Sequence, residues 1–270
     1  MKRVIDAWVN VNMSELGTPD YLLEVAEKYF KQGDDFFRDY SIEEMTATMD
    51  ELGVERAILT TDVSKPSAHV LSFIEKQPDR FALGVHLDPR RLMKTVNELA
   101  AMAASQPLVL ARITPFYFGL PPTDPVYYPV YSKCIELGLP LTINTGIPGP
   151  PAPAACQDPL HLDRVCLDFP DLKLVMAHGA DPWWGVACRL MLKYPNLYMM
   201  TSAYLPKYLP TELLVFMEKR APGKVMFASD HPAIPIGRCV EEARRLQLDD
   251  STLAAYLHGN AARLFFGEDG

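Results

Sequence analysis

Short apolar segments alternate with helix-like segments along the whole chain, and this alternation restricts the fold more than any other feature of the sequence. Each apolar segment has the length of a strand that is buried on both faces. The predicted strands are residues 3–10, 55–61, 81–86, 108–114, 140–144, 172–178, 197–201 and 225–228. Helices are predicted at residues 41–52, 66–77, 89–104, 124–137, 161–169, 182–194 and 211–220, and two more at 236–246 and 251–257. Eight such units predict a parallel α/β barrel, the (β/α)8 or TIM barrel. A doubly wound sheet is the alternative, but the sequence has no Gly-rich phosphate turn after an early strand.

The second strand begins late, and the extra residues predict a helical insertion after the first strand. Pro19 starts a segment with apolar residues at helical spacing that runs to Phe30. Ser41-Ile-Glu-Glu44 is a capping box for the next helix, and Gly53 ends that helix. No repeat or flexible linker is visible, so residues 1–270 are predicted to form one domain whose insertion lies over the carboxyl ends of the strands.

Composition excludes several classes of protein. The formal net charge is −8 and the pI is about 5.3, which argues against a nucleic-acid surface. No apolar run approaches the roughly 18 residues of a membrane helix, and the first residues enter a strand without a signal-peptide core. The five cysteines are odd in number and lack CxxC spacing. We therefore expect a cytoplasmic protein with no membrane or nucleic-acid partner.

One strand ends in ionisable residues. In Val225-Met-Phe-Ala-Ser-Asp-His-Pro232 an apolar run leads into Asp230 and His231, and Pro232 cannot continue a ladder. A carboxylate at the end of a buried strand costs free energy unless it has a partner or a function. In a barrel the carboxyl ends of the strands converge on one site. The residues predicted to meet there are Asp6, Trp8, Asn10, Thr60, Thr61, Asp62, His86, Arg112, Thr114, Asn144, His178, Thr201, Asp230 and His231.

Several of these segments resemble the amidohydrolase superfamily, in its amidohydrolase-related branch. That branch includes aminocarboxymuconate-semialdehyde decarboxylase, resorcylate-type decarboxylases and lactone hydrolases of aromatic breakdown. The similar segments are Ile5-Asp6, Gly138-Leu-Pro-Leu-Thr-Ile-Asn-Thr-Gly146, Leu172-Lys-Leu-Val-Met-Ala-His-Gly179, Pro182-Trp183, Val225 to Pro232, and Gly259-Asn-Ala-Ala-Arg-Leu-Phe265. They occur in the order of the family and span almost the whole chain. The resemblance implies a TIM barrel and an active site at its carboxyl end.

The chain departs from the family at the metal-ligand positions. The family carries Asp-x-His-x-His on the first strand and a histidine on the fifth, whereas this chain has Trp8, Asn10 and Asn144 there. Only His178 and Asp230 match family ligand positions. Zinc takes three or four nitrogen, sulfur or carboxylate ligands. We therefore expect no tightly bound metal and no other cofactor. A weakly held divalent ion such as zinc, bound by His178, Asp230 and either His86 or His231, is the alternative.

Each candidate residue has a functional and a structural interpretation. Asp230 is predicted to be a general base whose pKa is raised by burial, or a structural acid at a strand end. His178 is predicted to be an electrophile or proton donor beside it, or a core histidine. Arg112 is either a carboxylate anchor or the partner of Asp6 or Asp62 in an ion pair. Asn144, Asn10, Trp8, His86, Trp183 and His231 complete the predicted substrate site. The aromatic residues that could line an apolar pocket, rather than the core, are Trp8, Phe116, Tyr117, Phe118, Trp183, Trp184 and Tyr204.

Two classes of function fit these residues. The first is a metal-independent hydrolase or lyase for a small carboxylated cyclic or unsaturated compound, acting as a homodimer. In it His178 and Asn144 polarise a carbonyl as neutral donors in place of the metal. The second is a catalytically inactive subunit that pairs with a metal-containing paralogue in a heteromer. A metalloenzyme with a rearranged site is a third alternative.

Overall fold

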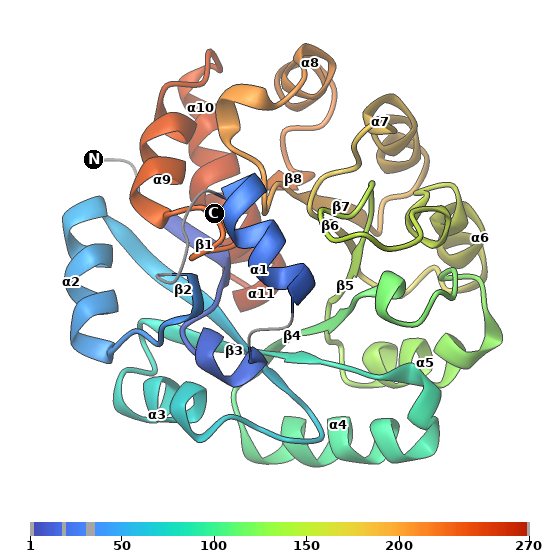
Figure 1. Cartoon of the computed structure of the whole chain (residues 1–270). Helices are drawn as coiled ribbons and strands as arrows, with labels where there is room; N and C mark the ends of the chain where they lie inside the picture. The colour runs from blue at the N-terminus through green and yellow to red at the C-terminus, as the bar shows by residue number, and fades with distance from the viewer. Residues whose placement is uncertain (1–2, 18–19, 31–35, 269–270) are drawn as a thin grey trace.

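Eight parallel strands form a nearly closed barrel surrounded by helices (Figure 1). The structure is a computed structural model that describes residues 3–17, 20–30 and 36–268. Neighbouring strands pair in sequence order from β1 to β8. The strands are β1 (Val4–Val9), β2 (Val54–Asp62), β3 (Phe81–His86), β4 (Leu108–Ile113), β5 (Leu141–Asn144), β6 (Leu174–Ala177), β7 (Leu197–Met200) and β8 (Val225–Met226). The prediction of a single-domain (β/α)8 barrel with eight strands is confirmed.

The barrel closes between β1 and the residues that follow β8. The predicted eighth strand, residues 225–228, is two residues too long, because the Phe227 amide donates to the Tyr256 carbonyl instead of extending the ladder. The next residues turn to β1: the Asp230 amide donates to the Trp8 carbonyl at 2.9 Å, and the Asn10 amide donates to the His231 carbonyl at 2.8 Å. These bonds place Asp230 directly beside the end of β1.

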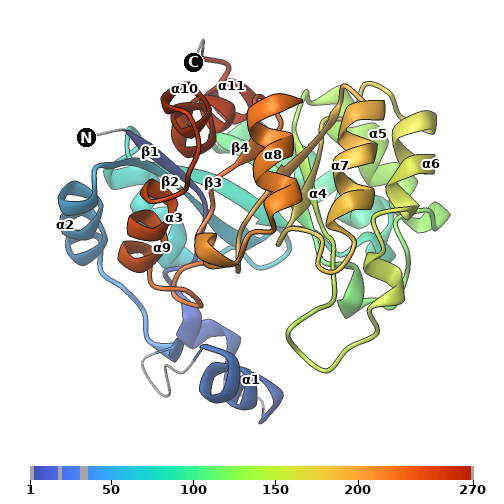
Figure 2. The same cartoon turned by 90° about the horizontal axis from the view of Figure 1, so that it is seen from above.

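Most helices cover the outside of the strands (Figure 2), and the last one lies across one end of the barrel. The helices are α2 (Ile42–Leu52), α3 (Ala68–Lys76), α4 (Met93–Ser105), α5 (Tyr128–Glu136), α6 (His161–Asp168), α7 (Trp184–Lys193), α8 (Thr211–Lys219), α9 (Ile236–Arg244), α10 (Asp250–Ala254) and α11 (Asn260–Phe266). The predicted capping box is present, since the Ser41 and Glu44 side chains accept each other's backbone amides, and Gly53 ends α2 with φ 63°. The predicted helix 89–104 is divided into the 3-10 turn Pro89–Arg91 and α4, because Leu92 has φ 47° between them.

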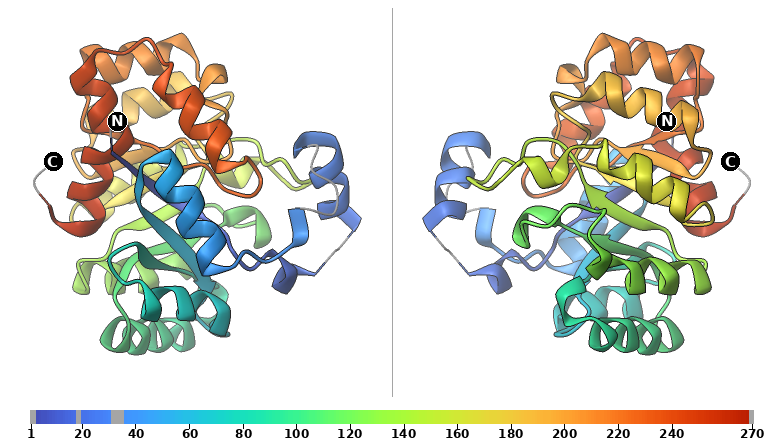
Figure 3. Two further views of the ribbon diagram at one scale, coloured as in Figure 1. Left: turned by 90° about the vertical axis from the view of Figure 1, so that its left-hand side faces the viewer. Right: turned by 90° about the vertical axis from the view of Figure 1, so that its right-hand side faces the viewer.

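Apolar side chains pack in two layers. The larger layer lies between the strands and the surrounding helices. The smaller one fills the inside of the barrel, where Ile5, Leu110 and Val175 meet Phe265 of α11. Asn260 fixes this helix by donating to the carbonyls of Pro222 and Val225, each at 2.7 Å. Figure 3 shows α11 at one end of the barrel and the segment after β1 at the other.

The segment after β1 projects from the carboxyl end of the barrel (Figures 2 and 3). It contains the 3-10 turn η1 (Met13–Leu16), helix α1 (Asp20–Val25) and the π-helical η2 (Ala26–Phe30). Pro19, the predicted start of the inserted helix, lies outside the described residues. Met13, Ala26, Phe36 and Ala233 form a small apolar cluster that ties the insertion to the loop after β8. Among the residues that the structure describes, no helix is long and apolar enough to span a membrane.

Candidate active site

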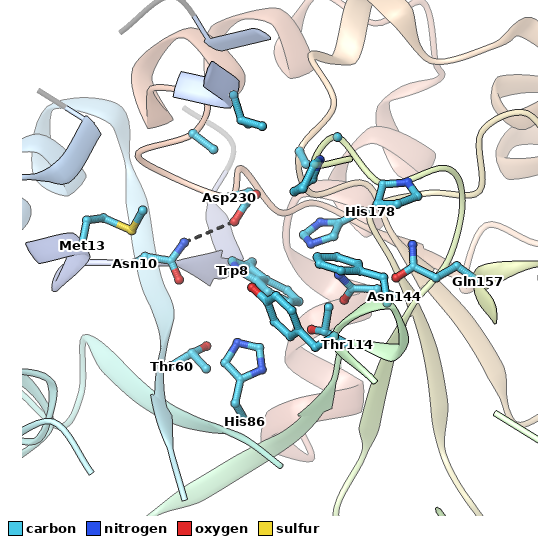
Figure 4. Close-up of a pocket in the computed structure, with 18 of the residues that line it drawn as sticks. Trp8, Asn10, Met13, Thr60, His86, Thr114, Asn144, Gln157, His178 and Asp230 are labelled. Carbon is cyan, nitrogen blue, oxygen red and sulfur yellow. Dashed lines mark hydrogen bonds between the residues drawn. The ribbon is translucent and has the colours of Figure 1, made fainter. Parts of the chain in front are cut away.

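A cavity of about 610 Å³ opens at the carboxyl ends of the strands, beneath the insertion. The residues predicted to meet at the site that do line the cavity are Trp8, Asn10, Thr60, Thr61, Asp62, His86, Thr114, Asn144, His178 and Asp230 (Figure 4). Met13, Glu15, Val25 and Phe36 of the insertion line it as well. Phe116, Tyr117 and Tyr204 are the further predicted aromatic residues in its wall, whereas Phe118, Trp183 and Trp184 are not in the lining.

Asp230 is held in the cavity by contacts with β1. Its backbone has φ 63°, a left-handed conformation that costs free energy for a residue other than glycine. Asn10 Nδ2 donates to Asp230 Oδ1 at 3.2 Å and to the His231 carbonyl at 3.0 Å (Figure 4). Burial raises the pKa of Asp230 to about 7, against the opposing effects of the Asn10 hydrogen bond and the Arg112 charge. Near neutral pH the carboxyl group can therefore both take and give a proton.

His178 is fixed by Ser202, a residue that the sequence analysis did not single out. The Ser202 Oγ accepts a hydrogen bond from the His178 amide at 3.1 Å and lies 2.8 Å from His178 Nδ1. Within the described residues Nδ1 is the one acceptor near this buried hydroxyl, so the Ser202 hydroxyl donates to Nδ1 and the ring proton resides on Nε2. Burial, followed by the Arg112 charge, lowers the pKa of His178 to about 3. The ring is neutral and can donate a hydrogen bond from Nε2.

The turn after His178 depends on a glycine. Gly179 has φ 65°, and a Cβ atom there would lie 2.1 Å from Trp184 Cη2. The Trp184 ring therefore packs against the backbone at the His178 turn, and Trp184 Nε1 donates to Asp181 Oδ1 at 3.1 Å. Trp183, predicted to bind substrate, is half-buried outside the cavity lining. The substrate-site prediction for Trp183 is therefore not supported by its position, because Trp184 and not Trp183 packs against the turn that carries His178.

The Trp8 ring lies between the two histidines of the site. Its centroid is 4.6 Å from that of His178 and 5.9 Å from that of His86. Its side chain is 4% exposed, so it closes the floor of the cavity. Burial, with the Arg112 charge second, lowers the pKa of His86 to about 4. No residue in the described part of the chain forms a hydrogen bond with the His86 ring, which leaves its nitrogens available to a ligand.

Arg112 lies beneath the floor and not in the cavity. Its guanidinium carbon is 3.6 Å from the centroid of the Trp8 ring, and its Nη2 donates to the Ala7 carbonyl at 2.8 Å. The residue is fully buried, does not line the cavity and forms no ion pair with any described carboxylate. Both interpretations of Arg112 from the sequence are thus corrected. The physical reason is the alternation of a strand: Thr114 reaches the cavity, and Arg112, two residues earlier on the same face, lies one layer deeper.

His231 and Asn144 differ in their access to the cavity. His231 follows Asp230 but points away, with its ring 4.6 Å from the Tyr40 ring, and it does not line the cavity. The prediction that His231 contacts substrate is not supported by this position. Asn144 ends β5 in the cavity wall and is 4% exposed.

Two further cavity residues come from loops that gave no sequence signal. Lys65, in the loop after β2, is exposed and is the one basic residue among the described lining residues. Gln157, in the loop after β5, donates from Nε2 to the Gly146 carbonyl at 2.8 Å and thereby shapes the wall next to Asn144. Neither position shows any periodicity or motif, because loop conformation decides which loop side chains face the site.

The comparisons with known proteins agree on family and fold. A family model described as "Amidohydrolase" matches residues 5–267. Comparison with curated protein sequences gives no match. Among solved structures, the chain is similar to a TIM-barrel protein from Bordetella bronchiseptica, with 23% identity, 97% of this chain and 98% of that chain covered, and a TM-score of 0.79.

Two similar structures are decarboxylases. The 5-carboxyvanillate decarboxylase from Sphingomonas paucimobilis has 20% identity, with 98% of this chain and 99% of that chain covered and a TM-score of 0.76. A dihydroxybenzoic acid decarboxylase from Polaromonas, with bound manganese and the inhibitor 2-nitroresorcinol, has 18% identity, with 98% and 97% covered and a TM-score of 0.69. At these identities the likeness establishes a shared fold.

Proposed function

Because the chain belongs to the amidohydrolase family, we propose that it is a lyase or hydrolase that acts on a small carboxylated cyclic or unsaturated compound without a metal. Its similarity to decarboxylases of small carboxylated aromatics supports this class of substrate. The position and environment of Asp230 carry the proposal. Asp230 is a cavity-lining carboxyl group with a pKa of about 7, held by Asn10 where the family has a metal-binding histidine.

In the proposed reaction Asp230 is the general base. Its carboxylate takes a proton from a water molecule that attacks the substrate, or from the substrate itself. The protonated carboxyl group returns that proton to the leaving group or to the product carbon. A base whose pKa lies near the working pH suits both steps.

His178 and Asn144 are the proposed electrophiles. His178 and Asn144 line the same cavity as Asp230. They would polarise a substrate carbonyl and stabilise the negative charge that develops on its oxygen. Because His178 is fixed by Ser202 and Asn144 by the end of a strand, both donors are positioned before substrate binds.

Manganese of the kind present in the Polaromonas decarboxylase does not fit the residues of this chain. The described residues contain no group of three His, Cys, Asp or Glu side chains that could hold a metal ion. The Trp8 ring lies against His178, and Asn10 and Asn144 offer amides, which are poor ligands for a transition metal beside a single histidine and carboxylate. These donors support chemistry that depends on protein groups alone.

The proposed contact for a substrate carboxylate is Lys65 and not Arg112. Arg112 is separated from the cavity by the Trp8 ring, whereas the Lys65 side chain reaches the cavity rim. An ammonium group on a flexible side chain can follow a carboxylate as it enters. Phe116, Tyr117 and Tyr204 would surround the ring or polyene of the substrate.

The test is turnover by chelator-treated protein. Wild-type protein and Asp230→Asn are incubated with 5-carboxyvanillate, 2,6-dihydroxybenzoate and a carboxylated lactone, and loss of substrate is followed by absorbance. We expect the wild type to convert at least one compound after chelation and the variant to bind it without conversion. Turnover that disappears on chelation and returns with manganese would contradict the metal-independent mechanism. Full turnover by Asp230→Asn would contradict the role of the base.

The second candidate function is a catalytically inactive subunit. The replacement of family ligands by Trp8, Asn10 and Asn144 favours it. Such a subunit would co-purify in a stoichiometric heteromer with a paralogue that carries Asp-x-His-x-His. The proposed enzyme would instead purify as a homo-oligomer, for which a homodimer is the simplest form. Light scattering and mass spectrometry of the purified complex distinguish the two.

A further inference from the structure

Arg112 is a buried cation that forms no ion pair with the described residues. Its side chain is fully buried, and Nε and Nη1 have no hydrogen-bond partner within the described residues. Its contacts are the Ala7 carbonyl and the face of the Trp8 ring. Gly84 on the neighbouring strand leaves room for it, since a Cβ atom there would lie 3.3 Å from Arg112 Nε.

Burying such a charge inside a barrel costs free energy. Removing a guanidinium from water without an ion pair costs several times the free energy that one hydrogen bond and one cation–π contact return. An apolar residue of similar volume would fill the same space at lower cost. A contribution to stability therefore does not explain why an arginine occupies this position.

Arg112 lies against the Trp8 ring, beneath the floor of the cavity. Trp8 and Asn144 stand at family ligand positions, and the Trp8 ring has Arg112 on one face and His178 close by, with centroids 4.6 Å apart. The ionisable carboxyls whose charges reach Arg112 are Asp230 and Asp6. We propose that the Arg112 guanidinium, stacked beneath Trp8, has replaced the metal as the positive charge of the site and keeps a divalent cation from the cavity floor.

The role of this charge in turnover rests on the proposed function. The exclusion of a cation by Arg112 is independent of that function. Like charges repel, so a buried cation beneath the cavity floor disfavours a second cation in the cavity above it. The chain thus carries a fixed cation in one layer of the barrel and neutral donors in the layer above. Asp230 then has a permanent counter-charge that cannot dissociate.

The test restores the family ligands with and without Arg112. Trp8→His/Asn10→His/Asn144→His is titrated with Mn²⁺ by calorimetry, in forms that keep Arg112 or add Arg112→Lys or Arg112→Met. We expect the Arg112→Met form to bind Mn²⁺ about tenfold or more tightly than the forms with arginine or lysine. Equal affinities in the three forms would overturn the proposal. Failure of all three to bind would also overturn it, because then Arg112 is not what excludes the cation.

Arg112→Met alone gives a second readout that needs no metal and no substrate. Methionine fills a similar volume and its sulfur packs well against an aromatic ring. We expect its Tm to equal or exceed that of the wild type. A Tm lower by more than about 4 °C would overturn the proposal, because Arg112 would then be a structural residue. If both readouts agree with the proposal and no substrate is turned over by the wild type, it is the proposed function that fails.

Discussion

The side-chain amide of Asn10 donates a hydrogen bond to Asp230 at 3.2 Å, and so joins the first strand to the residue that ends the barrel. The same Nδ2 donates to the His231 carbonyl at 3.0 Å, which fixes the amide orientation. A neutral donor therefore approaches the carboxylate from the end of the first strand. It lowers the pKa of Asp230 without cancelling the effect of burial.

Asp230→Asn should abolish turnover and leave the fold intact. Asparagine has the same shape and tolerates the left-handed backbone that Asp230 adopts at φ 63°. Because the amide cannot accept a proton, we expect kcat to fall by about 10²–10⁴-fold while substrate still binds. Steady-state kinetics and calorimetric binding measure the two effects, and a variant that keeps wild-type kcat would exclude Asp230 as the base.

Asn10→Ala should shift the pH dependence of the reaction. If Asp230 acts as a carboxylate, kcat/KM rises with pH through about 7, the pKa of the free protein. Removing the Asn10 hydrogen bond removes an interaction that lowers this pKa, so the rising limb should move to higher pH. Asn97→Ala, on the exposed side of α4, is the control. An unchanged limb in Asn10→Ala would show that the hydrogen bond does not act on the ionised form.

Ser202→Ala should impair both stability and turnover. The Ser202 hydroxyl is the partner of the His178 amide and of Nδ1, and both would be left unsatisfied in a buried site. We expect the free energy of unfolding to fall by about 1–3 kcal/mol. The ring would also lose the bond that fixes its tautomer, so kcat should fall while KM changes little. Ser105→Ala, an exposed serine of α4, is the matched control for urea denaturation and kinetics. A variant with wild-type kcat would mean that the tautomer of His178 does not matter.

Lys65→Ala should weaken substrate binding and leave the chemical step almost unchanged. Lys65 lines the cavity rim and lies outside the Asp230, His178 and Asn144 group. Loss of a charge-assisted contact costs roughly 1–2 kcal/mol, so we expect KM to rise about tenfold. Lys65→Arg should restore part of the affinity, and Lys94→Ala on α4 should have no effect. A fall in kcat at constant KM would argue against a binding role.

The barrel could be predicted from the sequence because each buried strand is a short apolar run, and the site could be predicted in part because strand ends converge. Trp8, Asn10, His86, Asn144, His178 and Asp230 all reach the cavity for this reason. Arg112 was misplaced because sequence position alone does not tell which layer of a barrel a side chain occupies. The depth follows from strand register, in which Arg112 pairs with Thr142 and His86. Ser202, Lys65 and Gln157 were missed because loop geometry is set by tertiary contacts such as the Gln157–Gly146 bond.

The stability of Asp230→Asn relative to the wild type should increase as the pH rises. The pKa of Asp230 is about 7 in the folded chain, against an ordinary value of 3.8. Below about pH 4 the carboxyl group is protonated in both states. As the pH rises from there to about 7, the unfolded chain loses this proton and the folded chain keeps it, so the wild type loses stability; above about 7 the loss is complete.

The Asp230→Asn variant lacks this loss, and its free energy of unfolding relative to the wild type should increase from pH 5 to pH 8 and then stay constant. The upper limit of the increase between pH 5 and pH 8 is about 3 kcal/mol, because part of the loss is already complete at pH 5. Groups that do not interact with Asp230 cancel in this difference, whereas Asp6, whose charge raises the pKa of Asp230, is part of it. Urea denaturation at pH 5, 6, 7 and 8 measures it, and Asp171→Asn, an exposed acid outside the cavity, is the matched control. A difference that does not change with pH would mean that Asp230 has an ordinary pKa in the folded chain. The proposed base would then be fully ionised near neutral pH, with no protonated carboxyl group in reserve.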